Sequence, residues 1–480
     1  MNSRLILFSI LALAPMALPA ESPPNILVIL ADDLGQRDLV CYNPDSFHET
    51  PALDRLASQG VRFTDGYAAN PVCSPTRYAL MTGKWPTRSG LTNWLAGMRA
   101  ETFQGAPLTR RLPADETTIA EALKPAGYET TFVGKWHLGD EPADWPEHHG
   151  FDVNVAGCGK GHPQSWFAPY GNPRLDDGPE GEYLTERLAT ETIARLKEAK
   201  QSGKPFLLTH CFYQVHTPLK APGELVEKYQ AKAKRLGLKD EFAPEKQYFL
   251  PLDKPRLVRQ NQSLPVYAAM VEAMDHATGR ILAALDELDL AGNTLVIFSS
   301  DNGGLSTSKG SPTSNLPFRG GKGWVYEGGI REPFIVRWPG VAPAGKVDST
   351  PVTTLDIFPT AIAAAGLPAS ATDGMDLAPL LRGGDLPERD LFWHYPHYGN
   401  QGGFPGGAIR SGGWKLVENY EDGSVALYDL SKDAGERNDL AAGETTRVTA
   451  MRKRLHEWYR VTGAKFLRQK KGGPEPWRPE

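Results

Sequence analysis

The 480 residues, of which 40% are hydrophobic and 23% charged, suffice for one large domain plus a smaller one, and they exclude a chain that is disordered over most of its length. The net charge of -5 at pH 7 provides no global basic field, which argues against nucleic acid as a partner. An anionic substrate would need positive charge placed locally at its binding site.

The N-terminal residues have the pattern of a cleaved secretory signal peptide. Arg4 precedes an apolar run over residues 5–18, and Pro19 and Ala20 come before a polar stretch. A membrane anchor is the alternative, but the run is shorter than the roughly 20 apolar residues that a spanning helix needs. We therefore expect residues 1–20 to be removed and the mature protein to be periplasmic or secreted, without a membrane anchor.

Strand and helix patterns alternate after this leader. The apolar run at residues 25–30 is typical of a buried parallel strand, and Thr50 and Pro51 then begin a helix. The clearest later helix covers residues 266–288, where apolar residues repeat near the helical period. Further strands are predicted at residues 129–133, 205–211, 294–299 and 333–337. The alternation predicts an α/β fold with a large mixed, mostly parallel sheet flanked by helices.

Three stretches depart from this pattern. Residues 222–262 are charged and interrupted by prolines, which indicates an insertion rather than core. Residues 303–329 and 398–413 are rich in glycine, and we predict that they form loops over the edge of the sheet.

A change of pattern near residue 391 predicts a second, smaller unit. Short strand patterns precede one amphipathic helix whose apolar face includes Met451 and Trp458. These strand patterns occupy residues 408–410, 414–417 and 426–430. We therefore predict a catalytic domain at residues 21–390 and a C-terminal subdomain at residues 391–480, built from a small antiparallel sheet with one helix.

Polar residues follow the ends of four predicted strands, and the carboxyl ends of parallel strands meet at the edge of a sheet where ligands bind. These residues are Asp32, Asp33, Lys135, His137, His216, Asp301 and Asn302. The acidic residues and the asparagine offer only oxygen, which suits a hard divalent cation and excludes a soft thiolate site. Taken singly, Asp-Asp and Asp-Asn-Gly are more often turns or caps. Together they predict a metal site, with Ca²⁺ preferred over Mg²⁺.

The segment Cys73-Ser74-Pro75-Thr76-Arg77 carries the most specific signal in the chain. Cys-x-Pro-x-Arg is the pattern whose cysteine is oxidised to formylglycine in sulfatases, and residues 71–83 resemble the longer sulfatase signature. The chain is therefore identified as a member of the formylglycine-dependent sulfatases of the alkaline phosphatase superfamily, similar to arylsulfatases and N-acetylgalactosamine sulfatases. The resemblance covers essentially the whole mature chain.

Shorter motifs extend the resemblance. Residues 127–137 resemble the second sulfatase signature, in which a lysine and a histidine, here Lys135 and His137, face the sulfate. His216 stands in a His-x-Pro element, and Lys322 resembles the family's second sulfate-binding lysine. A single lysine is usually a solvated side chain, and a single histidine is usually a core or loop residue. The order and spacing of these motifs, rather than any one residue, therefore support their assignment to a sulfate site.

The resemblance implies a nucleophile and a cofactor. A formylglycine-generating maturation enzyme would convert Cys73 to 3-oxoalanine, whose hydrated form has two hydroxyls. One hydroxyl attacks sulfur, and the other then expels sulfate and restores the aldehyde. The divalent cation, held by the four oxygen-donor side chains and by the modified Cys73, would lower the pKa of the attacking hydroxyl.

The resemblance also implies roles for the basic residues. Lys135 and Lys322 would stabilise the charge that develops on the sulfuryl group. Arg77 would hydrogen-bond the diol or neighbouring carboxylates. His216 would protonate the leaving alcohol and His137 would remove the proton that allows sulfate to leave, although the assignment of these two roles stays open.

The substrate is harder to predict. His394 and His397 lie in an aromatic stretch at residues 393–398 whose side chains could stack on a sugar and hydrogen-bond to it. We therefore expect the substrate to be a sulfated polysaccharide or its oligosaccharides. Galactose- and N-acetylgalactosamine-type sugars are the candidates. The alternative is that these aromatics pack at the junction of the two units. The sequence predicts neither the oligomeric state nor endo or exo action.

Two other functions are compatible with parts of this pattern. A phosphodiesterase or phosphonate hydrolase of the same superfamily tends to have histidine where this chain has Asn302, which favours sulfate over phosphate. A secreted protein that only binds sulfated glycans is the other alternative.

Apart from Cys73, the cysteines at 41, 158 and 211 permit at most one disulfide, with buried free thiols as the alternative.

Overall fold

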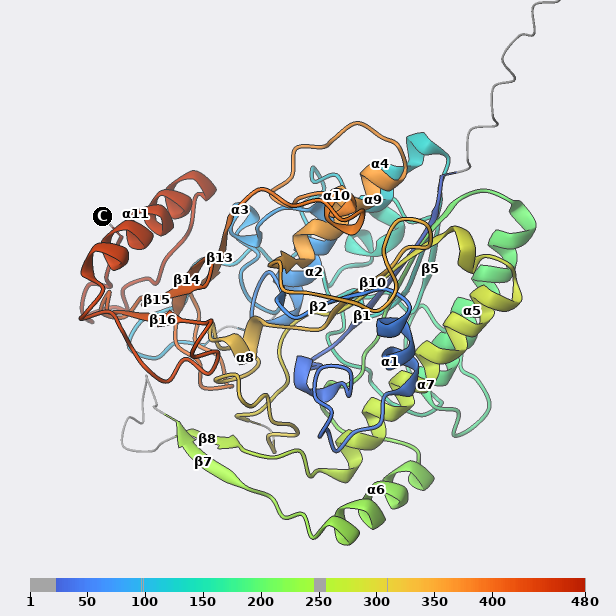
Figure 1. The fold of residues 1–480 in the computed structure, drawn as a ribbon, viewed down its shortest axis with the longest axis horizontal. Helices are drawn as coiled ribbons and strands as arrows, with labels where there is room; N and C mark the ends of the chain where they lie inside the picture. Colours follow the sequence, from blue (N-terminus) through green and yellow to red (C-terminus); the bar gives the residue numbers. More distant parts are fainter. Residues whose placement is uncertain (1–22, 96, 98, 246–255, 309, 480) are drawn as a thin grey trace, which may run out of the picture.

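The structure is a computed structural model that describes residues 23–479 except 96, 98, 246–255 and 309 (Figure 1). The predicted signal peptide, residues 1–20, lies outside the described residues. Among the helices that are described, none has both the length and the apolar composition of a membrane span.

An eight-stranded mixed sheet forms the centre of the molecule, with strand order β11-β2-β10-β9-β1-β6-β4-β5 (Figure 1). Its middle strand β1 (Asn25–Ala31) pairs in parallel with β6 (Phe206–Cys211) and β9 (Thr294–Ser300). All three strands are buried along their whole length, which explains why their sequences are continuous apolar runs.

The outer strands complete the sheet and make it mixed. β4 and β5 continue the parallel arrangement beyond β6, whereas β10 runs antiparallel to both β9 and β2. Their bounds are β4 (Glu129–Gly134), β5 (Val153–Val155), β10 (Phe334–Arg337), β2 (Val61–Phe63) and β11 (Lys346–Asp348). The predicted large, mostly parallel sheet is confirmed.

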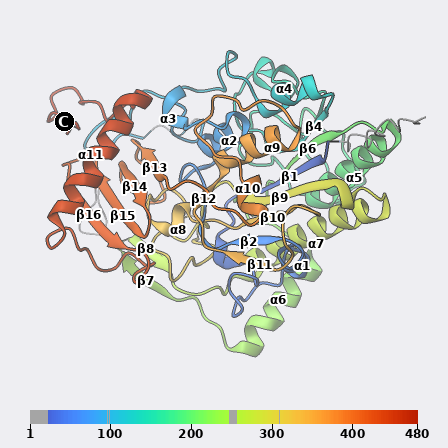
Figure 2. The ribbon, with the colours of Figure 1, turned by 45° about the horizontal axis from the view of Figure 1, so that its top comes forward.

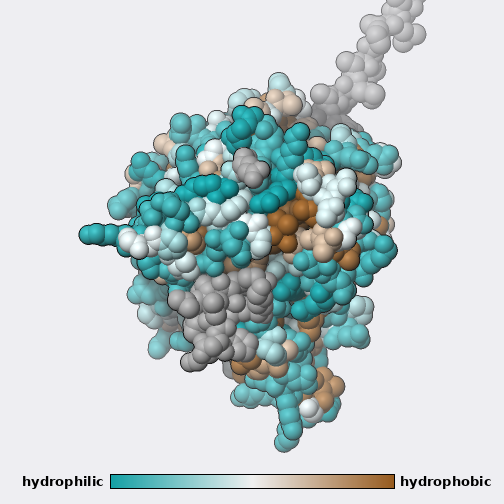
Figure 3. All heavy atoms as spheres, turned by 90° about the vertical axis from the view of Figure 1, so that its left-hand side faces the viewer, coloured by the Kyte–Doolittle hydropathy of each residue, from teal (hydrophilic) through white to brown (hydrophobic). Residues whose placement is uncertain are grey.

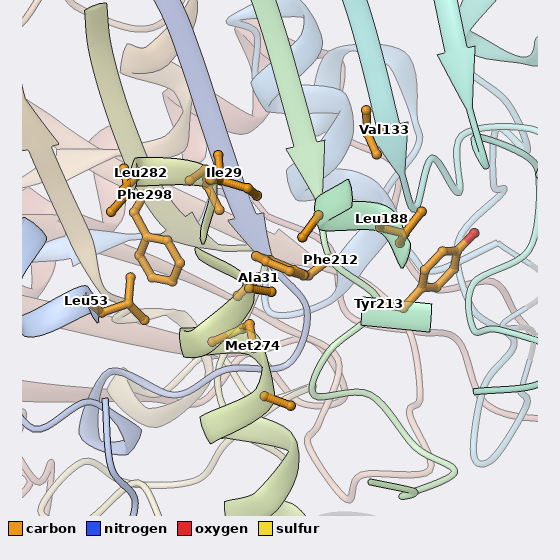
Figure 4. Packing of buried hydrophobic residues seen from close by; sticks show 14 of the residues in the cluster. Ile29, Ala31, Leu53, Val133, Leu188, Phe212, Tyr213, Met274, Leu282 and Phe298 are labelled. Atoms are coloured by element: carbon orange, nitrogen blue, oxygen red, sulfur yellow. The ribbon is translucent and has the colours of Figure 1, made fainter. Parts of the chain in front are cut away.

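Helices cover both faces of this sheet. Because side chains alternate along a strand, Ile29 and Ala31 of β1 face one layer and Val28 the other. Figure 4 shows Ile29 and Ala31 with Leu53 and Met274 in the first layer. That layer contains the helices α1 (Pro51–Ser58), α5 (Leu184–Ser202) and α7 (Pro265–Glu287). The other contains α2 (Cys73–Thr82), α4 (Ile119–Leu123), α9 (Ile357–Ala364) and α10 (Ala378–Leu381).

A four-stranded antiparallel sheet and α11 (Thr445–Thr462) form the C-terminal unit. Its strands, in spatial order, are β13 (Asp390–Tyr395), β14 (Gly406–Ser411), β15 (Trp414–Asn419) and β16 (Val425–Asp429). Met451, Leu455 and Trp458 of α11 pack in one cluster with Ile409 and Leu416 of the sheet. The predicted strands and helix are present, and β13 is a further strand that includes the first half of the predicted aromatic rim.

Buried ions connect the two sheets. Lys415 of β15 is fully buried, and its Nζ lies 2.9 Å from carboxylate oxygens of both Glu327 and Glu436. Glu327 belongs to the short helix α8 (Glu327–Ile330) of the larger unit. Arg410 of β14 pairs with Asp65 at 2.6 Å. The C-terminal sheet is therefore held to the larger unit by specific charge pairs as well as by apolar packing.

The predicted insertion has regular structure of its own. It contains α6 (Gly223–Leu236) and the antiparallel strands β7 (Phe242–Glu245) and β8 (Arg256–Arg259). In Figures 1 and 2 this hairpin lies beside the C-terminal unit, and Glu245 forms an ion pair with Arg437 of that unit. Further short elements are α3 (Pro86–Ser89), β3 (Gly66–Tyr67), β12 (Val352–Thr353) and several short 3-10 helices.

Candidate active site

The carboxyl ends of four parallel strands meet at one edge of the central sheet. Asp32 and Asp33 follow β1 directly, Lys135 follows β4, and Asp301 follows β9. The parallel register of β1, β4, β6 and β9 places these ends side by side. The helix α2 begins at Cys73 against the same edge. The predicted metal and catalytic residues therefore converge, as their strand-end positions indicate.

A group of oxygen atoms around Cys73 has the character of a cation site. Ligand atoms of Asp32, Asp33 and Cys73 lie within 4.8 Å of one another. Asp32 Oδ1, Asp33 Oδ2 and Asn302 Oδ1 are buried and have no hydrogen-bond partner among the described residues. Buried oxygens without partners are rare and costly, so three together fit a hard cation that would bind them.

Both carboxylate oxygens of Asp301, unlike those of Asp32 and Asp33, accept hydrogen bonds. Its Oδ1 accepts a hydrogen bond from the backbone N–H of Asp33 at 3.2 Å, and its Oδ2 accepts two from the Arg77 guanidinium at 2.9 and 2.7 Å. A carboxylate has about four lone-pair positions, so Asp301 retains capacity for a cation. Arg77 also donates to the carbonyl oxygen of Lys135 at 2.6 Å, which fixes the end of β4 beside α2.

Two buried lysines hold the aspartates. Lys135 Nζ lies 2.6 Å from Asp32 Oδ2, and Lys322 Nζ lies 2.6 Å from Asp33 Oδ1. Burial alone would lower the pKa of Lys322, but the negative charges led by Asp33 raise it above its ordinary value. Lys322 therefore stays charged inside the protein and can meet an anionic group.

The nucleophile position is buried and begins a helix. Burial raises the pKa of the Cys73 thiol, although Lys135 and Lys322 oppose the shift, so an unmodified Cys73 would be a poor thiolate nucleophile at neutral pH. Pro75 lies in the first turn of α2, where its missing N–H costs no hydrogen bond. The positive end of this helix lies at the site, where it favours an anion.

Both predicted catalytic histidines lie at the same edge. His216 Nε2 is 3.8 Å from Asp33 Oδ2, and its Nδ1 lies 2.5 Å from the carbonyl oxygen of Thr217. His137 has a left-handed backbone, with φ at 57°, and its buried Nδ1 has no partner among the described residues. Burial and the nearby lysines lower the pKa of each imidazole, so each is neutral at neutral pH before substrate arrives.

Comparison with known proteins decides the family. The sulfatase family model matches residues 24–367, more than half of the chain. This chain belongs to the sulfatase family. It is therefore a sulfuric ester hydrolase, and its membership implies a formylglycine nucleophile and a divalent cation. A second family model, described as N-sulphoglucosamine sulphohydrolase, C-terminal, matches residues 320–461.

Several relatives of this sulfatase cover most of its length. It is 36% identical to N-acetylgalactosamine-6-sulfatase of Homo sapiens, over 78% of this chain and 69% of that protein. It is 31% identical to a sulfatase of Formosa agariphila, over 95% of this chain and 93% of that protein. Among solved structures, the crystal structure of Ps i-CgsB in complex with k-i-k-neocarrahexaose has a TM-score of 0.72 and 28% identity, covering 91% of this chain and 93% of that chain.

One neighbour of the sulfatase site was not predicted. The exposed His162 stacks on His216, with ring centroids 6.3 Å apart and planes 12° from parallel. The preceding Gly161 lies against His137, because a Cβ at this position would come within 2.5 Å of that ring. The loop at residues 158–162 thus touches both histidines. Neither residue stands in a recognisable motif, so only the fold brings them to the site.

The predicted substrate rim of the sulfatase is buried. His394 Nδ1 lies 2.6 Å from the Tyr420 hydroxyl, and its Nε2 lies 2.9 Å from the carbonyl oxygen of Lys465. His397 Nε2 lies 2.8 Å from the Thr92 hydroxyl. His394 belongs to β13 of the C-terminal unit, and His397 contacts Thr92 of the larger unit, an arrangement that fits the alternative interpretation of packing at the junction.

The remaining cysteines of the sulfatase are free thiols. Cys158 and Cys211 are buried and Cys41 is half-buried, and none of the three forms a disulfide in the structure. The interpretation as free thiols is the one that the structure supports.

Proposed function

We propose that this sulfatase is exported and removes sulfate from sulfated polysaccharides or their oligosaccharides, with galactose- and N-acetylgalactosamine-type sugars as the first candidates. The single observation that carries the sulfate chemistry is the convergence at one sheet edge of Cys73, two buried lysines and three oxygens that lack a hydrogen-bond partner among the described residues. The similarity to N-acetylgalactosamine-6-sulfatase and to a structure that holds a neocarrahexaose supports the carbohydrate substrate.

The cofactors we propose are a formylglycine made from Cys73 and one Ca²⁺, with Asp32, Asp33, Asp301 and Asn302 as its ligands and the modified Cys73 as a further one. When bound, the cation would supply Lewis acid chemistry, lowering the pKa of a ligated hydroxyl and polarising a sulfate oxygen. The hard, all-oxygen character of these four side chains supports Ca²⁺ over a soft transition metal. A formylglycine-generating enzyme would act as the maturation partner.

The chain's own residues would recognise the sulfate. Lys135 and Lys322 each hold an aspartate at 2.6 Å, so both ammonium groups are already oriented when an anion enters. Preorganised charges of this kind cost no rearrangement during the reaction. Arg77 has a structural role, since it pairs with Asp301 and fixes the end of β4.

The histidines would move protons. The Nε2 atom of His216 faces Asp33. We propose that His216 protonates the leaving alcohol. His137, neutral and with an unpartnered Nδ1, would accept the proton released when sulfate leaves. Substitution of each histidine against substrates of different leaving groups would separate the two roles.

A direct comparison of two substrates tests sulfate against phosphate. Matured enzyme should turn over 4-nitrophenyl sulfate with a much higher kcat/KM than the matching nitrophenyl phosphate diester. The presence of Asn302, where the phosphate-cleaving members of the superfamily tend to have histidine, is the reason for this preference. A higher kcat/KM for the phosphate diester would contradict the assignment.

A substitution separates an enzyme from a glycan-binding protein. Cys73→Ala should abolish turnover of sulfate esters while leaving binding of a sulfated oligosaccharide measurable. Cys41→Ala is the matched control, because this half-buried cysteine lies beside α1, where its N–H donates to Asp54. Equal turnover by Cys73→Ala and wild type would contradict the proposed nucleophile.

The proposed boundaries are a signal peptide at residues 1–20, a catalytic domain at 21–390 and a C-terminal subdomain at 391–480. The position of β13 at the start of the second sheet supports the last boundary. N-terminal sequencing of protein from the extracellular or periplasmic fraction would test the export and the cleavage.

A further inference from the structure

Positive charge is concentrated at the C-terminal end of the chain. Residues 445–480 contain ten lysines and arginines but three glutamates, whereas the whole chain carries a net charge of -5. A basic segment on an acidic protein is a local field that attracts polyanions. Figure 3 looks onto the side of the molecule that carries α11, and hydrophilic residues cover most of it.

The cations of this segment fall into two sets according to their acidic partners. Arg447, Arg452, Arg454 and Arg460 form ion pairs. Within the part of the chain that the structure describes, no such pair occurs for a second set of residues. These are Lys453, Lys465, Arg468, Lys470 and Lys471, which we call the basic track. Four of the five fall within residues 465–471, so their charges reinforce one another.

The track is joined to the segment that leads into the active site. Gln104 and Arg468 exchange backbone hydrogen bonds of 2.9 and 2.8 Å, and Lys470 Nζ donates to the carbonyl oxygen of Glu101 at 2.6 Å. The same segment reaches the start of α2, since the N–H of Leu95 donates to the Ser74 hydroxyl at 3.2 Å. Hydrogen bonds of Gln104 and Leu95, nine residues apart in one segment, therefore link the track to the residue next to Cys73.

A groove lies along the far part of the track. It has a volume of about 910 Å³ and runs between α11 and residues 463–466, with Lys453 and Lys465 in its lining. Such a volume is at the upper end of the range for small-ligand sites, and this groove is open rather than enclosed. Its lining combines the basic side chains of Lys453 and Lys465 with apolar surface, which suits a chain of sugars that carry anions.

We propose that the basic track binds the parts of a sulfated carbohydrate chain that lie beyond the sulfate being hydrolysed. The inference rests on the proposed carbohydrate substrate and extends it: the enzyme acts on a polymer or a long oligosaccharide that contacts α11 and the C-terminal tail. The contacts are electrostatic, so they weaken as salt screens them. They contribute to KM for long substrates and leave the chemical step unchanged.

A triple variant tests the track. Lys453→Gln, Lys465→Gln and Lys471→Gln together remove three exposed charges that hold no ion pair within the described residues, so the fold should be retained. Three exposed contacts of about 0.5 kcal/mol each correspond to about a tenfold rise in KM for a sulfated galactan polymer. The kcat for that polymer, and both kinetic constants for 4-nitrophenyl sulfate, should stay at wild-type values.

A matched control carries Lys197→Gln, Lys200→Gln and Lys234→Gln, which remove the same charge from exposed positions of α5 and α6. It should leave the KM for the polymer unchanged. A second measurement uses Cys73→Ala protein on a column that carries the sulfated galactan. Adding the track substitutions should lower the salt concentration of elution, whereas adding the control substitutions should not.

The outcomes separate this inference from the proposed function. Equal behaviour of the track and control variants in KM and in elution would overturn the track while leaving the sulfatase activity intact. Turnover of 4-nitrophenyl sulfate without any turnover of sulfated galactan or its oligosaccharides would overturn the carbohydrate substrate and the track together.

Discussion

At the scale of single residues, the site consists of charges that are already paired before substrate enters. Lys322 is the clearest case, because its ammonium group lies 2.6 Å from Asp33 inside the protein. We predict that Lys322→Ala lowers kcat/KM for 4-nitrophenyl sulfate by about 10²–10³-fold, the usual effect of removing one preorganised group. Lys346→Ala, which removes a partly exposed lysine from a surface pair, is the control and should have no effect. A loss below tenfold for Lys322→Ala would contradict the assigned role.

His216 gives a prediction that depends on the leaving group. A sugar alcohol needs protonation as it departs more than nitrophenol does, so His216→Ala should lower kcat/KM more for a sulfated sugar than for 4-nitrophenyl sulfate. The expected loss for the sugar is about 10²–10⁴-fold. His137→Ala should affect both substrates to a similar degree. If the sensitivities of the two variants were reversed, the two histidines would exchange roles.

At the scale of elements, Asp275 of α7 supports the start of α1. Its carboxylate accepts hydrogen bonds from the backbone N–H groups of Ala52 and Leu53, at 2.9 and 2.8 Å. Burial raises the pKa of Asp275 to about 7, from an ordinary value of 3.8. Between these two values the folded state binds more protons than the unfolded state, so this residue's contribution to stability falls as pH rises from about 4 to about 7.

Asp275→Asn removes this titration and keeps an acceptor for one of the two N–H groups. The free energy of unfolding of the variant should therefore increase relative to that of wild type as pH rises over this range, so the variant becomes relatively more stable. Denaturant unfolding of both proteins at several pH values measures the difference. A difference that stays constant with pH, or that changes in the opposite direction, would contradict the raised pKa.

The elements also show what the sequence could predict. Buried parallel strands have continuous apolar runs, so β1, β6 and β9 could be located, and with them Asp32, Asp33 and Asp301 at their ends. His162 could not be found in this way, because it reaches His216 through a loop whose path depends on tertiary packing. The sequence of residues 393–398 predicts a sugar rim where the structure has a buried strand end, because alternation of aromatic and polar residues does not distinguish a binding surface from a strand at a junction.

At the scale of the whole molecule, the C-terminal sheet depends on buried charge. Lys415 is fully buried between Glu327 and Glu436. Lys415→Met should destabilise the protein by about 3–5 kcal/mol, because it removes the cation that Glu436 and Glu327 share and leaves Glu327 with Arg331 alone. Denaturant unfolding measures this change. Lys432→Met is the control, since Lys432 forms an exposed pair with Asp429 and its removal should change little. Comparable stability of the two variants would contradict the importance of the buried network.

The most direct test of the account is the mass of the tryptic peptide that spans Cys73, taken from enzyme whose turnover of 4-nitrophenyl sulfate has been measured. We predict that the measured mass of this peptide is lower than the mass calculated with an unmodified cysteine, by the amount lost when the thiol side chain becomes an aldehyde. We also predict that the modified fraction rises in proportion to the specific activity of different preparations. Fully active enzyme in which Cys73 remains an intact thiol would contradict the account.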